Sequence, residues 1–437
     1  MTVSVSDALA NRQTDPEYLR SQVTHLSALV EASKILNSTL NLDRLLELIL
    51  EVATRQLETD RGTVYLLDKQ AGEWRARISQ GLESRILRVK VGQGISGKVA
   101  ETGETIRIED AYQDQRFLQK FDTASGYRTR SVLCMAIRNK TGEIIGVIQL
   151  LNKIHGTFGL EDEVFLQSLS VHMAIALENA KLHQEIVDQQ RIRTELALAR
   201  QIQQNLLPRA PERWHRYRMA ATAETCFEVG GDFYDFLTVS PNTLAVVIAD
   251  VSGKGISSAL VMSTMQATMR AMLAGVHSFE RLLERMNEVI RDYTGGRMFV
   301  TLFLALLDAE SRKLHYINAG HNPPVLVRAD GTNEQLAEGG TVLGLLPQVS
   351  FSRAQAEMQA GDVLVLYTDG LSEASNAADD MFGTEGLVAS VERALADGAA
   401  AGSPEAIMSR ILADMQEFSA GLPQADDQTL IVISPDQ

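Results

Sequence analysis

Four acidic residues in the second half of the chain occupy positions that suit metal chemistry: Asp232, Asp250, Asp369 and Asp426. Each lies at a turn or beside an apolar, strand-like run, and a strand end directs its side chain outward from a rigid sheet edge. Four carboxylates gathered at one edge would repel each other strongly. Two divalent cations would neutralise them, so the pattern predicts a two-metal centre.

The surroundings of these carboxylates favour hard cations. Glycines stand close by at Gly230, Gly231, Gly253 and Gly370, and they let the backbone approach an ion without a Cβ clash. All-oxygen coordination without a His or Cys cluster is typical of Mg²⁺ or Mn²⁺. Two such ions suit phosphoryl transfer to water, because they activate a water and hold the attacking and leaving oxygens. Direct in-line attack is expected, since no Cys-x5-Arg loop offers a covalent route.

Apolar runs in this half predict the sheets and helices that position the carboxylates. Strand-like runs cover residues 244–249, 299–307, 313–318, 363–367 and 429–434, and helical patterns cover residues 257–273 and 279–292. Ser278 is the expected N-cap of the second helix.

The first half of the chain predicts one α+β domain. Helical spacing runs from Val23 to Leu57 with Asn41 as an internal N-cap, and another helix is expected from Glu161 to beyond Leu182. Between these helices, strand-like runs cover residues 62–68, 74–78, 105–108, 131–138 and 144–151, with a turn at Ala71–Gly72.

The segment between the halves, residues 178–206, contains neither Gly nor Pro. Apolar residues follow two seven-residue series, Ile175, Leu182 and Leu196 in one and Ile192, Ala199 and Leu206 in the other. This spacing favours a short, imperfect coiled coil that dimerises and relays a signal. An isolated amphipathic linker helix is the alternative.

The composition narrows the class of protein. The 437 residues carry a net charge of −15, which argues against nucleic-acid binding because no excess of Lys and Arg is available for phosphates. Two cysteines, Cys134 and Cys226, do not suggest a disulfide scaffold. No apolar run approaches the ~20 residues that cross a membrane, and the N-terminus lacks a signal-peptide pattern. We expect a cytoplasmic protein that is not bound to a membrane.

Longer motifs extend the acidic pattern over residues 202–434. They are Gly230-Gly-Asp-Phe-Tyr-Asp235, Ala249-Asp-Val-Ser-Gly-Lys-Gly255, Asn318-Ala-Gly-His-Asn-Pro323, Tyr367-Thr-Asp-Gly370 and Asp426-Asp-Gln-Thr429, after the lead-in Ala199-Arg-Gln-Ile-Gln-Gln-Asn-Leu-Leu-Pro208. With these motifs the second half resembles the SpoIIE/RsbU-type phosphatases, a bacterial branch of the PPM (protein phosphatase 2C-like) serine/threonine phosphatases. The resemblance implies an α-β-β-α sandwich with two Mn²⁺ or Mg²⁺ ions at one end.

The resemblance also assigns the metal ligands. Asp232 and Asp250 would be the central ligands, with the backbone carbonyl of Val251 nearby, and Asp369 and Asp426 would complete the set. The neighbouring Asp427 fits the last position less well. Eukaryotic members have a His after Asp-Gly and an upstream Arg for phosphate, and this chain matches neither feature, so phosphate binding is expected to fall mainly to the metals.

Other residues near these motifs have two readings each. Lys254 either touches the substrate phosphate or decorates a glycine loop with Gly253. His321 either braces a turn beside the site or transfers a proton. Asp235 and Glu373 either support the ligands or cap a turn, and Asp427 is a candidate for a group that supports the ligands or the substrate.

Residues 26–185 resemble a GAF domain, through Gly92-Gln-Gly-Ile-Ser-Gly97, Ala100-Glu-Thr-Gly103 and the strand at 144–151. Five further residues match the signature of cyclic-nucleotide-binding GAF domains: Asn152, Lys153, Phe158, Asp162 and Glu163. The signature implies either a bound cyclic nucleotide or a structural clasp in which Lys153 pairs with Asp162. Another small ligand, a partner protein and a purely dimerising role stay open.

The whole pattern predicts four segments: a tail (1–22), a GAF sensor domain (23–183), a helical coiled-coil linker (184–207) and a PPM phosphatase domain (208–437). The expected protein is a homodimer through its GAF and linker helices. The resemblance points to a phosphorylated anti-sigma-factor antagonist with a STAS domain as substrate, in a partner-switching pathway. A catalytically weak receptor and a phosphatase of small phosphoesters are the alternatives.

Overall fold

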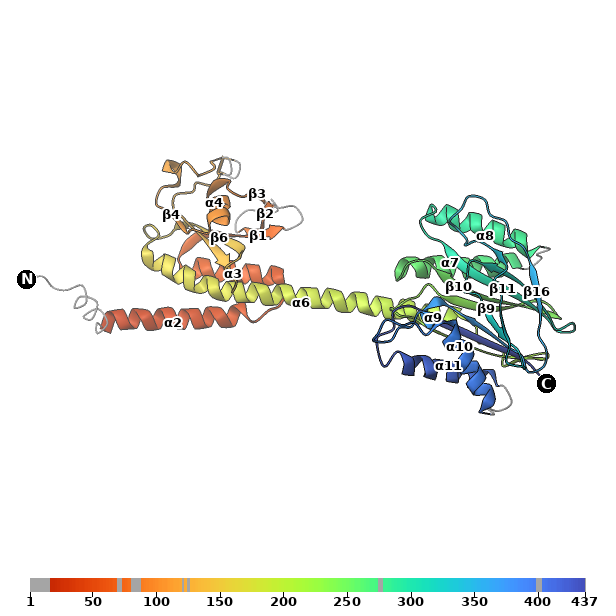
Figure 1. Ribbon diagram of the computed structural model, residues 1–437. Helices are drawn as coiled ribbons and strands as arrows, with labels where there is room; N and C mark the ends of the chain where they lie inside the picture. The colour runs from red at the N-terminus through yellow and green to blue at the C-terminus, as the bar shows by residue number, and fades with distance from the viewer. Residues whose placement is uncertain are drawn as a thin grey trace, which may run out of the picture. The chain divides into compact units, whose positions relative to one another are not determined.

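The computed structural model describes residues 16–68, 73–79, 88–119, 122–123, 126–273, 278–397 and 403–436. The chain divides into two compact units, Met1–Arg191 and Ile192–Gln437. Helix α6 (Leu160–Leu206) contributes residues to both units (Figure 1). The turn expected at Ala71–Gly72 lies outside the described residues.

The first unit is built on a six-stranded antiparallel sheet with the order β3-β2-β1-β6-β5-β4. Its strands are β1 (Thr59–Asp68), β2 (Glu73–Ser79), β3 (Arg88–Val89), β4 (Ile106–Ile108), β5 (Val132–Arg138) and β6 (Ile144–Lys153). One face packs on α2 (Pro16–Leu36), α3 (Leu42–Gln56) and the start of α6, and the other packs on α4 (Gly94–Thr102) and the 3-10 turn η1 (Ala111–Gln113). The predicted helix–sheet–helix domain is confirmed.

Of three helix starts in this unit, that of α3 agrees with the sequence-based prediction, and those of α2 and α4 differ from it. The Asn41 side chain accepts a hydrogen bond from the Arg44 backbone N–H at 2.9 Å, as expected of an N-cap. Helix α2 begins at Pro16, inside the segment expected to be a loose tail, because proline is tolerated in a first helical turn. Helix α4 was not predicted. Its Gly97 is required, since a Cβ there would lie 2.4 Å from the Lys90 carbonyl oxygen.

The second unit contains two six-stranded sheets. The first has the order β15-β12-β11-β10-β9, with β16 also paired to β12, and the second has the order β14-β13-β17-β18-β8-β7. The strands of the first sheet are β9 (Phe233–Ser240), β10 (Thr243–Val251), β11 (Val300–Asp308), β12 (Lys313–Ala319), β15 (Gly339–Gly340) and β16 (Ala354–Glu357). The strands of the second are β7 (Arg213–Trp214), β8 (Tyr217–Glu224), β13 (Val325–Val327), β14 (Asn333–Gln335), β17 (Val363–Tyr367) and β18 (Gln428–Pro435).

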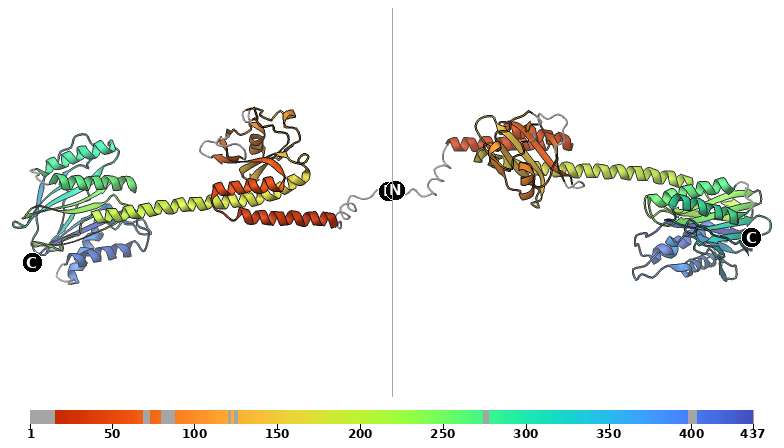
Figure 2. Two further views of the ribbon diagram at one scale, coloured as in Figure 1. Left: turned by 180° about the vertical axis from the view of Figure 1, so that it is seen from behind. Right: turned by 90° about the horizontal axis from the view of Figure 1, so that it is seen from above.

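Four layers make up this unit (Figures 1 and 2). The two sheets pack face to face around a core that includes Tyr217, Phe303 and Ile431. Helices α7 (Ile256–Leu273) and α8 (Phe279–Thr294) cover the outer face of the first sheet, and α10 (Gly383–Ala396) and α11 (Pro404–Phe418) cover that of the second. The α-β-β-α sandwich implied by the resemblance is therefore confirmed, and Ser278 caps α8 as expected.

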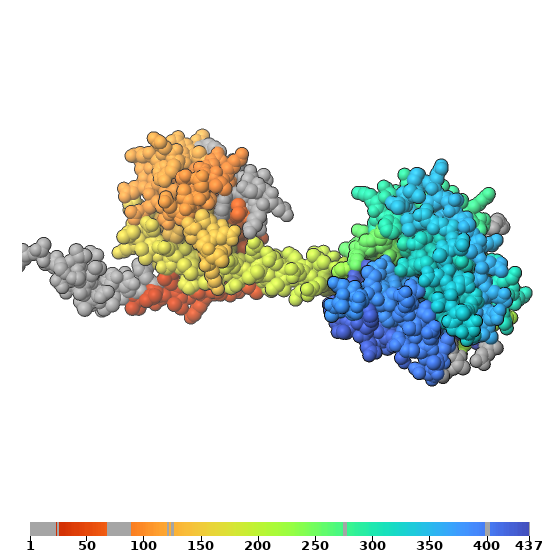
Figure 3. Space-filling view, in the orientation of Figure 1, coloured from red at the N-terminus to blue at the C-terminus, as the bar shows by residue number. Residues whose placement is uncertain are grey.

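Helix α6 runs without interruption through the segment expected to be a coiled-coil linker. Several of its apolar side chains are exposed, including Leu182, Ile186, Ile192 and Ile202. The space-filling view shows this part of α6, in yellow-green, open on the face displayed (Figure 3). In the described part of the chain no helix is both long enough and apolar enough to cross a lipid bilayer.

Candidate active site

Asp232 lies directly before β9 and is buried, with a relative exposure of 6%. Its Oδ2 atom accepts hydrogen bonds from the hydroxyls of Thr368, at 2.7 Å, and Thr429, at 2.8 Å. Burial and the nearby Asp250 raise the pKa of this carboxyl well above its ordinary value, while the two hydroxyls partly offset that rise. The side chain is thus fixed in orientation by threonines that follow β17 and begin β18.

Asp250 occupies the penultimate position of β10, opposite Thr301 of β11. Burial raises the pKa of Asp250 to about 7, and the nearby carboxylates of Asp369 and Asp426 add to the shift. Asp369 is the first residue of the short helix α9 (Asp369–Ser372), and only Thr368 separates it from the end of β17. Burial, and then Asp426, raise the pKa of Asp369 as well. The four predicted carboxylates therefore lie close enough at one edge of the sandwich to repel each other.

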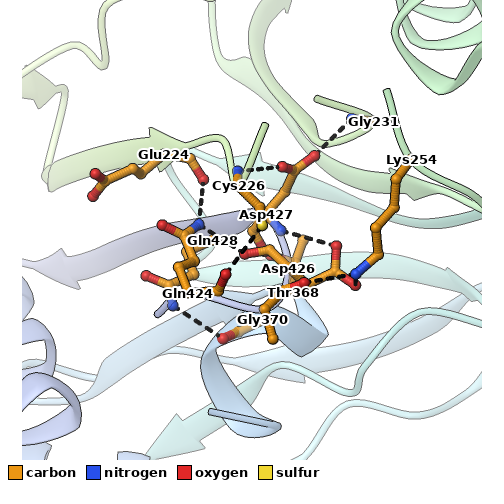
Figure 4. Close-up of polar contacts among 11 residues, drawn as sticks. Glu224, Cys226, Gly231, Lys254, Thr368, Gly370, Gln424, Asp426, Asp427 and Gln428 are labelled. Atoms are coloured by element: carbon orange, nitrogen blue, oxygen red, sulfur yellow. Dashed lines mark hydrogen bonds and ion pairs between the residues drawn. The ribbon is translucent and has the colours of Figure 1, made fainter. Parts of the chain in front are cut away.

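Asp426 and Asp427 precede β18 and have different partners (Figure 4). The carboxylate of Asp427 accepts hydrogen bonds from the backbone N–H groups of Cys226, at 2.8 Å, and Gly231, at 2.7 Å. The Oδ2 atom of Asp426 forms an ion pair with Lys254 Nζ at 2.8 Å. Asp427 thus joins two backbone segments of the fold, and Asp426 faces a cation.

Lys254 belongs to the glycine loop that follows β10. Its Nζ donates a hydrogen bond to the Ala425 carbonyl oxygen at 2.6 Å as well as pairing with Asp426. Gly253 adopts a φ of +93°, a left-handed conformation that favours glycine. The loop therefore presents an ammonium group to one of the predicted metal ligands.

His321 is buried next to Thr301, the residue that pairs with Asp250 across β10 and β11. Its Nδ1 lies 2.9 Å from the Thr301 hydroxyl, and its backbone N–H donates to the Asn318 side chain at 2.7 Å. Burial lowers the pKa of His321 to about 4, so the ring is neutral near pH 7. These contacts support the bracing role of His321 rather than proton transfer.

Asp235 lies away from this edge and pairs with Arg270 of α7. The Arg270 Nε and Nη2 atoms contact the two carboxylate oxygens of Asp235 at 2.6 and 3.1 Å. The Asp235 side chain is only 1% exposed. Asp235 therefore fastens β9 to α7, and the structure does not bring it to the four carboxylates.

The glycines beside the carboxylates stand where other segments come close. A Cβ on Gly231 would lie 2.9 Å from the Val251 carbonyl oxygen, so this carbonyl faces the glycine pair before Asp232. A Cβ on Gly370 would lie 2.0 Å from the Asp427 carbonyl oxygen. The Gly-Asp and Asp-Gly pairs are thus required by packing as well as by chemistry.

The donor set fits a hard divalent cation in its chemistry, because its side-chain atoms are carboxylate oxygens. Within the described ranges, no three His, Cys, Asp or Glu side chains are grouped closely enough to hold a metal ion by themselves. Burial raises the pKa of Asp250 and of Asp369, and the nearby carboxylate of Asp426 adds to both shifts. A cation would lower this repulsion and draw the oxygens together.

Three residues that support the site have no role predicted from the sequence: Gln203, Thr368 and Thr429. The two threonines adjoin predicted ligands in the Tyr367–Gly370 and Asp426–Thr429 motifs, so their position was a usable signal. Gln203 lies on a helix 27 residues before its partner Gly230, and only the fold reveals this contact. The same holds for Arg270 and Asp235, which pair away from the carboxylate edge.

In the first unit, the signature residues form the structural clasp. Lys153 forms an ion pair with Asp162 at the start of α6, and Phe158 is buried in the core. Asn152 is buried at a φ of 55°. Its amide accepts the Arg130 backbone N–H at 2.6 Å and donates to the Arg128 carbonyl oxygen at 2.9 Å. Glu163, half-buried, lies in the same first turn of α6.

Comparison with known proteins identifies both domains. Residues 41–177 match the family model of the GAF domain, and residues 240–436 match that of stage II sporulation protein E (SpoIIE). The chain is 28% identical over 223 residues to Protein IcfG of Synechocystis sp., covering 45% of this chain and 35% of that protein. It is 30% identical over 187 residues to phosphoserine phosphatase RsbU of Bacillus subtilis, covering 42% of this chain and 55% of RsbU.

The GAF domain has relatives of another kind. The chain is 33% identical over 167 residues to the probable 3',5'-cyclic phosphodiesterase pde-5 of Caenorhabditis elegans, covering 36% of this chain and 23% of that protein. The chain thus spans between 23% and 55% of the length of these three relatives, and the likeness is one of domains. The predicted order of the two domains is confirmed: the chain contains a GAF domain followed by a domain of the SpoIIE family.

Proposed function

We propose that this protein is a metal-dependent serine/threonine protein phosphatase whose SpoIIE-family domain is regulated by its GAF domain. The observation that carries the proposal is the gathering of Asp232, Asp250, Asp369 and Asp426 at one edge of the sandwich, where burial and neighbouring carboxylates raise the pKa of the first three. The likeness to the phosphoserine phosphatase RsbU supports phosphoserine as the group acted on.

In this proposal the four carboxylates and the Val251 carbonyl hold two Mn²⁺ or Mg²⁺ ions. When bound, such ions supply an activated water and neutralise charge on the phosphoryl group. The chain itself contributes orientation. Thr368 and Thr429 fix the Asp232 carboxylate, and Asp427 holds the backbone of Gly231 beside it. Lys254 adds a positive charge at the same edge, where a substrate phosphate would enter.

The direct test is Mn²⁺-dependent phosphate release from a phosphoserine protein by wild type and Asp369→Asn. Wild type should be active only with metal, and the variant should lose most of that activity. Asp292→Asn, an exposed position on α8, serves as the matched control and should keep wild-type activity. If wild type is inactive with every metal, removal of residues 1–190 separates inhibition by the sensor from the receptor alternative, in which the truncated protein stays inactive.

For the substrate, we propose a phosphorylated anti-sigma-factor antagonist with a STAS domain. The support is the resemblance to the SpoIIE/RsbU-type branch, together with the match to RsbU. A comparison of kcat/KM on a phosphorylated STAS protein and on p-nitrophenyl phosphate tests this choice. A higher kcat/KM for the small ester would favour a phosphatase of small molecules.

For regulation, we propose a homodimer formed through the GAF and linker helices. Exposed apolar side chains support it on α6, at Leu182, Ile186 and Ile192, and on α2, at Leu26 and Val30. Light scattering should give twice the chain mass, and Leu182→Glu with Ile192→Glu should shift it toward one chain. The GAF domain would sense a small ligand or a partner. Because the Lys153–Asp162 clasp closes on itself, the signature gives no separate support for a cyclic nucleotide.

A further inference from the structure

Gln203 lies in the last turn of α6, and both the nitrogen and the oxygen of its side-chain amide form hydrogen bonds with the same residue, Gly230. Its Nε2 donates to the Gly230 carbonyl oxygen at 2.7 Å, and its Oε1 accepts the Gly230 backbone N–H at 3.0 Å. The side chain is buried, with 7% exposure. A paired amide of this kind fixes the position and the orientation of the peptide that it contacts.

Gly230 and Gly231 lead directly into Asp232, and they are held from a second direction. The Gly231 N–H donates to Asp427 Oδ2 at 2.7 Å, and a Cβ on Gly230 would lie 2.5 Å from the same oxygen. The glycine pair therefore lies between Gln203 and Asp427. This double hold determines where the chain enters β9, and with it where the Asp232 carboxylate stands.

We propose that Gln203 is a positioning residue for the carboxylate edge, so that the affinity of this edge for a divalent cation depends on the last turn of α6. The expected effect on metal affinity rests on the proposed function, whereas the hydrogen bonds between Gln203 and Gly230 are independent of it. Partners that orient a metal ligand typically change metal affinity 10- to 100-fold when they are replaced. Gln203 acts through Gly230 and Asp232 and touches no reacting group.

Gln266 of α7 provides a matched control. It is also buried, with 3% exposure, and its Nε2 donates to the Leu206 carbonyl oxygen at the end of α6 at 2.9 Å. It therefore holds the same helix end without contacting Gly230. A loss of affinity that follows only from loosening α6 would appear equally in variants of Gln203 and of Gln266.

The test compares Gln203→Met with Gln266→Met in the full chain, since methionine keeps the side-chain length and removes the amide. Calorimetric titration with Mn²⁺ should show about tenfold weaker binding for Gln203→Met and wild-type binding for Gln266→Met. Thermal unfolding in EDTA should show similar stability for the two variants. Equal Mn²⁺ affinity in Gln203→Met and wild type, or an equal loss in Gln266→Met, overturns the inference.

Amide hydrogen exchange supplies a readout that needs no metal. The Gly230 amide should exchange faster in Gln203→Met than in wild type and Gln266→Met, and unchanged exchange overturns the inference by itself. If Gln203→Met does not fold, Gln203→Glu keeps the acceptor for the Gly230 N–H and should still bind Mn²⁺ more weakly than wild type. Wild type that binds no Mn²⁺ overturns the proposed function, and with it the metal part of this inference.

Discussion

The carboxylates of Asp426 and Asp427 belong to adjacent residues but contact different donors, a side-chain ammonium and backbone N–H groups. Asp427 accepts the backbone N–H groups of Cys226 and Gly231, and Asp426 forms an ion pair with Lys254. The first arrangement joins segments about 200 residues apart in the chain. The second leaves a carboxylate available to a competing cation.

This difference predicts different consequences for Asp426→Asn and Asp427→Asn. Asp427→Asn replaces an oxygen that accepts a backbone N–H, so it should lower the free energy of unfolding by about 1–3 kcal/mol. Asp426→Asn should leave stability within about 0.5 kcal/mol and weaken Mn²⁺ binding about tenfold or more. Urea unfolding in EDTA and calorimetric titration measure the two effects. The reverse pattern would assign the ligand role to Asp427.

The Lys254–Asp426 pair predicts that Lys254→Gln binds Mn²⁺ more tightly than wild type. In wild type a cation at Asp426 must displace the ammonium, and the variant has no such competitor. Both side chains are more than a third exposed, so the pair is weak and the gain should be about two- to fivefold. Lys254→Arg, which keeps the charge, should bind like wild type in the same titration. Weaker binding by Lys254→Gln would contradict this competition.

The raised pKa of Asp250 predicts how stability depends on pH in the metal-free protein. Its folded pKa is about 7 against an ordinary 3.8, so the folded state binds more protons between these values. This carboxyl therefore stabilises the fold below about pH 4, and its contribution is lost as pH rises to about 7. The loss is on the order of a few kcal/mol.

Unfolding of wild type and Asp250→Asn in EDTA at pH 5 and pH 8 measures this contribution together with the effect of Asp250 on the pKa of Asp232. His321, whose pKa is lowered to about 4, gives the opposite slope below pH 6.5 in both proteins and cancels in the difference. Asp250→Asn should be the more stable protein at pH 8, and Mn²⁺ should narrow the gap by stabilising wild type. Equal stability of both proteins at pH 8 would count against the repulsion.

The Asp235–Arg270 pair predicts a structural rather than a catalytic phenotype. Arg270→Ala leaves the buried Asp235 carboxylate without its cation and should lower the free energy of unfolding by about 2–3 kcal/mol. The apolar pair Asp235→Leu with Arg270→Met should recover part of this loss. Mn²⁺ affinity, measured below the unfolding temperature, should stay that of wild type. A tenfold change in affinity would place Asp235 in the site after all.

The clasp of the GAF domain predicts strong sensitivity at Asn152. Asn152→Ala removes the side-chain hydrogen bonds to the backbone of Arg130 and Arg128. It also leaves alanine, whose side chain forms no hydrogen bonds, at a positive φ. The cost should be about 2–3 kcal/mol. Asn152→Gly tolerates the backbone conformation and should be more stable than Asn152→Ala by about 1 kcal/mol. Chemical unfolding, followed by the GAF-domain transition, measures both.

The sequence could place the carboxylates at one edge of the fold because their signal is local. Each of Asp250, Asp369 and Asp426 adjoins an apolar strand, and the strand ends were visible as a change from apolar to polar residues. The strands β8 and β9 were not predicted, because polar or half-buried residues interrupt their apolar pattern. Short strands such as β13 and β14, with three residues each, carry too little periodicity to be predicted.

Contacts between distant segments account for what the sequence analysis missed in the site. The role of Gln203 depends on an α6 turn meeting a glycine 27 residues later. Arg270 reaches Asp235 only because α7 covers β9. Neither side chain differs in type or spacing from ordinary helix-surface residues, so no local pattern marks it. The structural role of Asp427 likewise depends on its backbone partners, which lie about 200 residues away in the sequence.

The closeness of backbone to backbone at Gly370 separates what the fold must keep from what catalysis must keep. A side chain there would overlap the Asp427 carbonyl, whereas Asp369 beside it is a half-buried carboxylate whose substitution by asparagine keeps the side-chain size. A descendant that abandoned phosphate hydrolysis for binding alone would be expected to retain its glycines and lose its acids. Among natural variants, the acids rather than the glycines would therefore tell a working enzyme from a retired one.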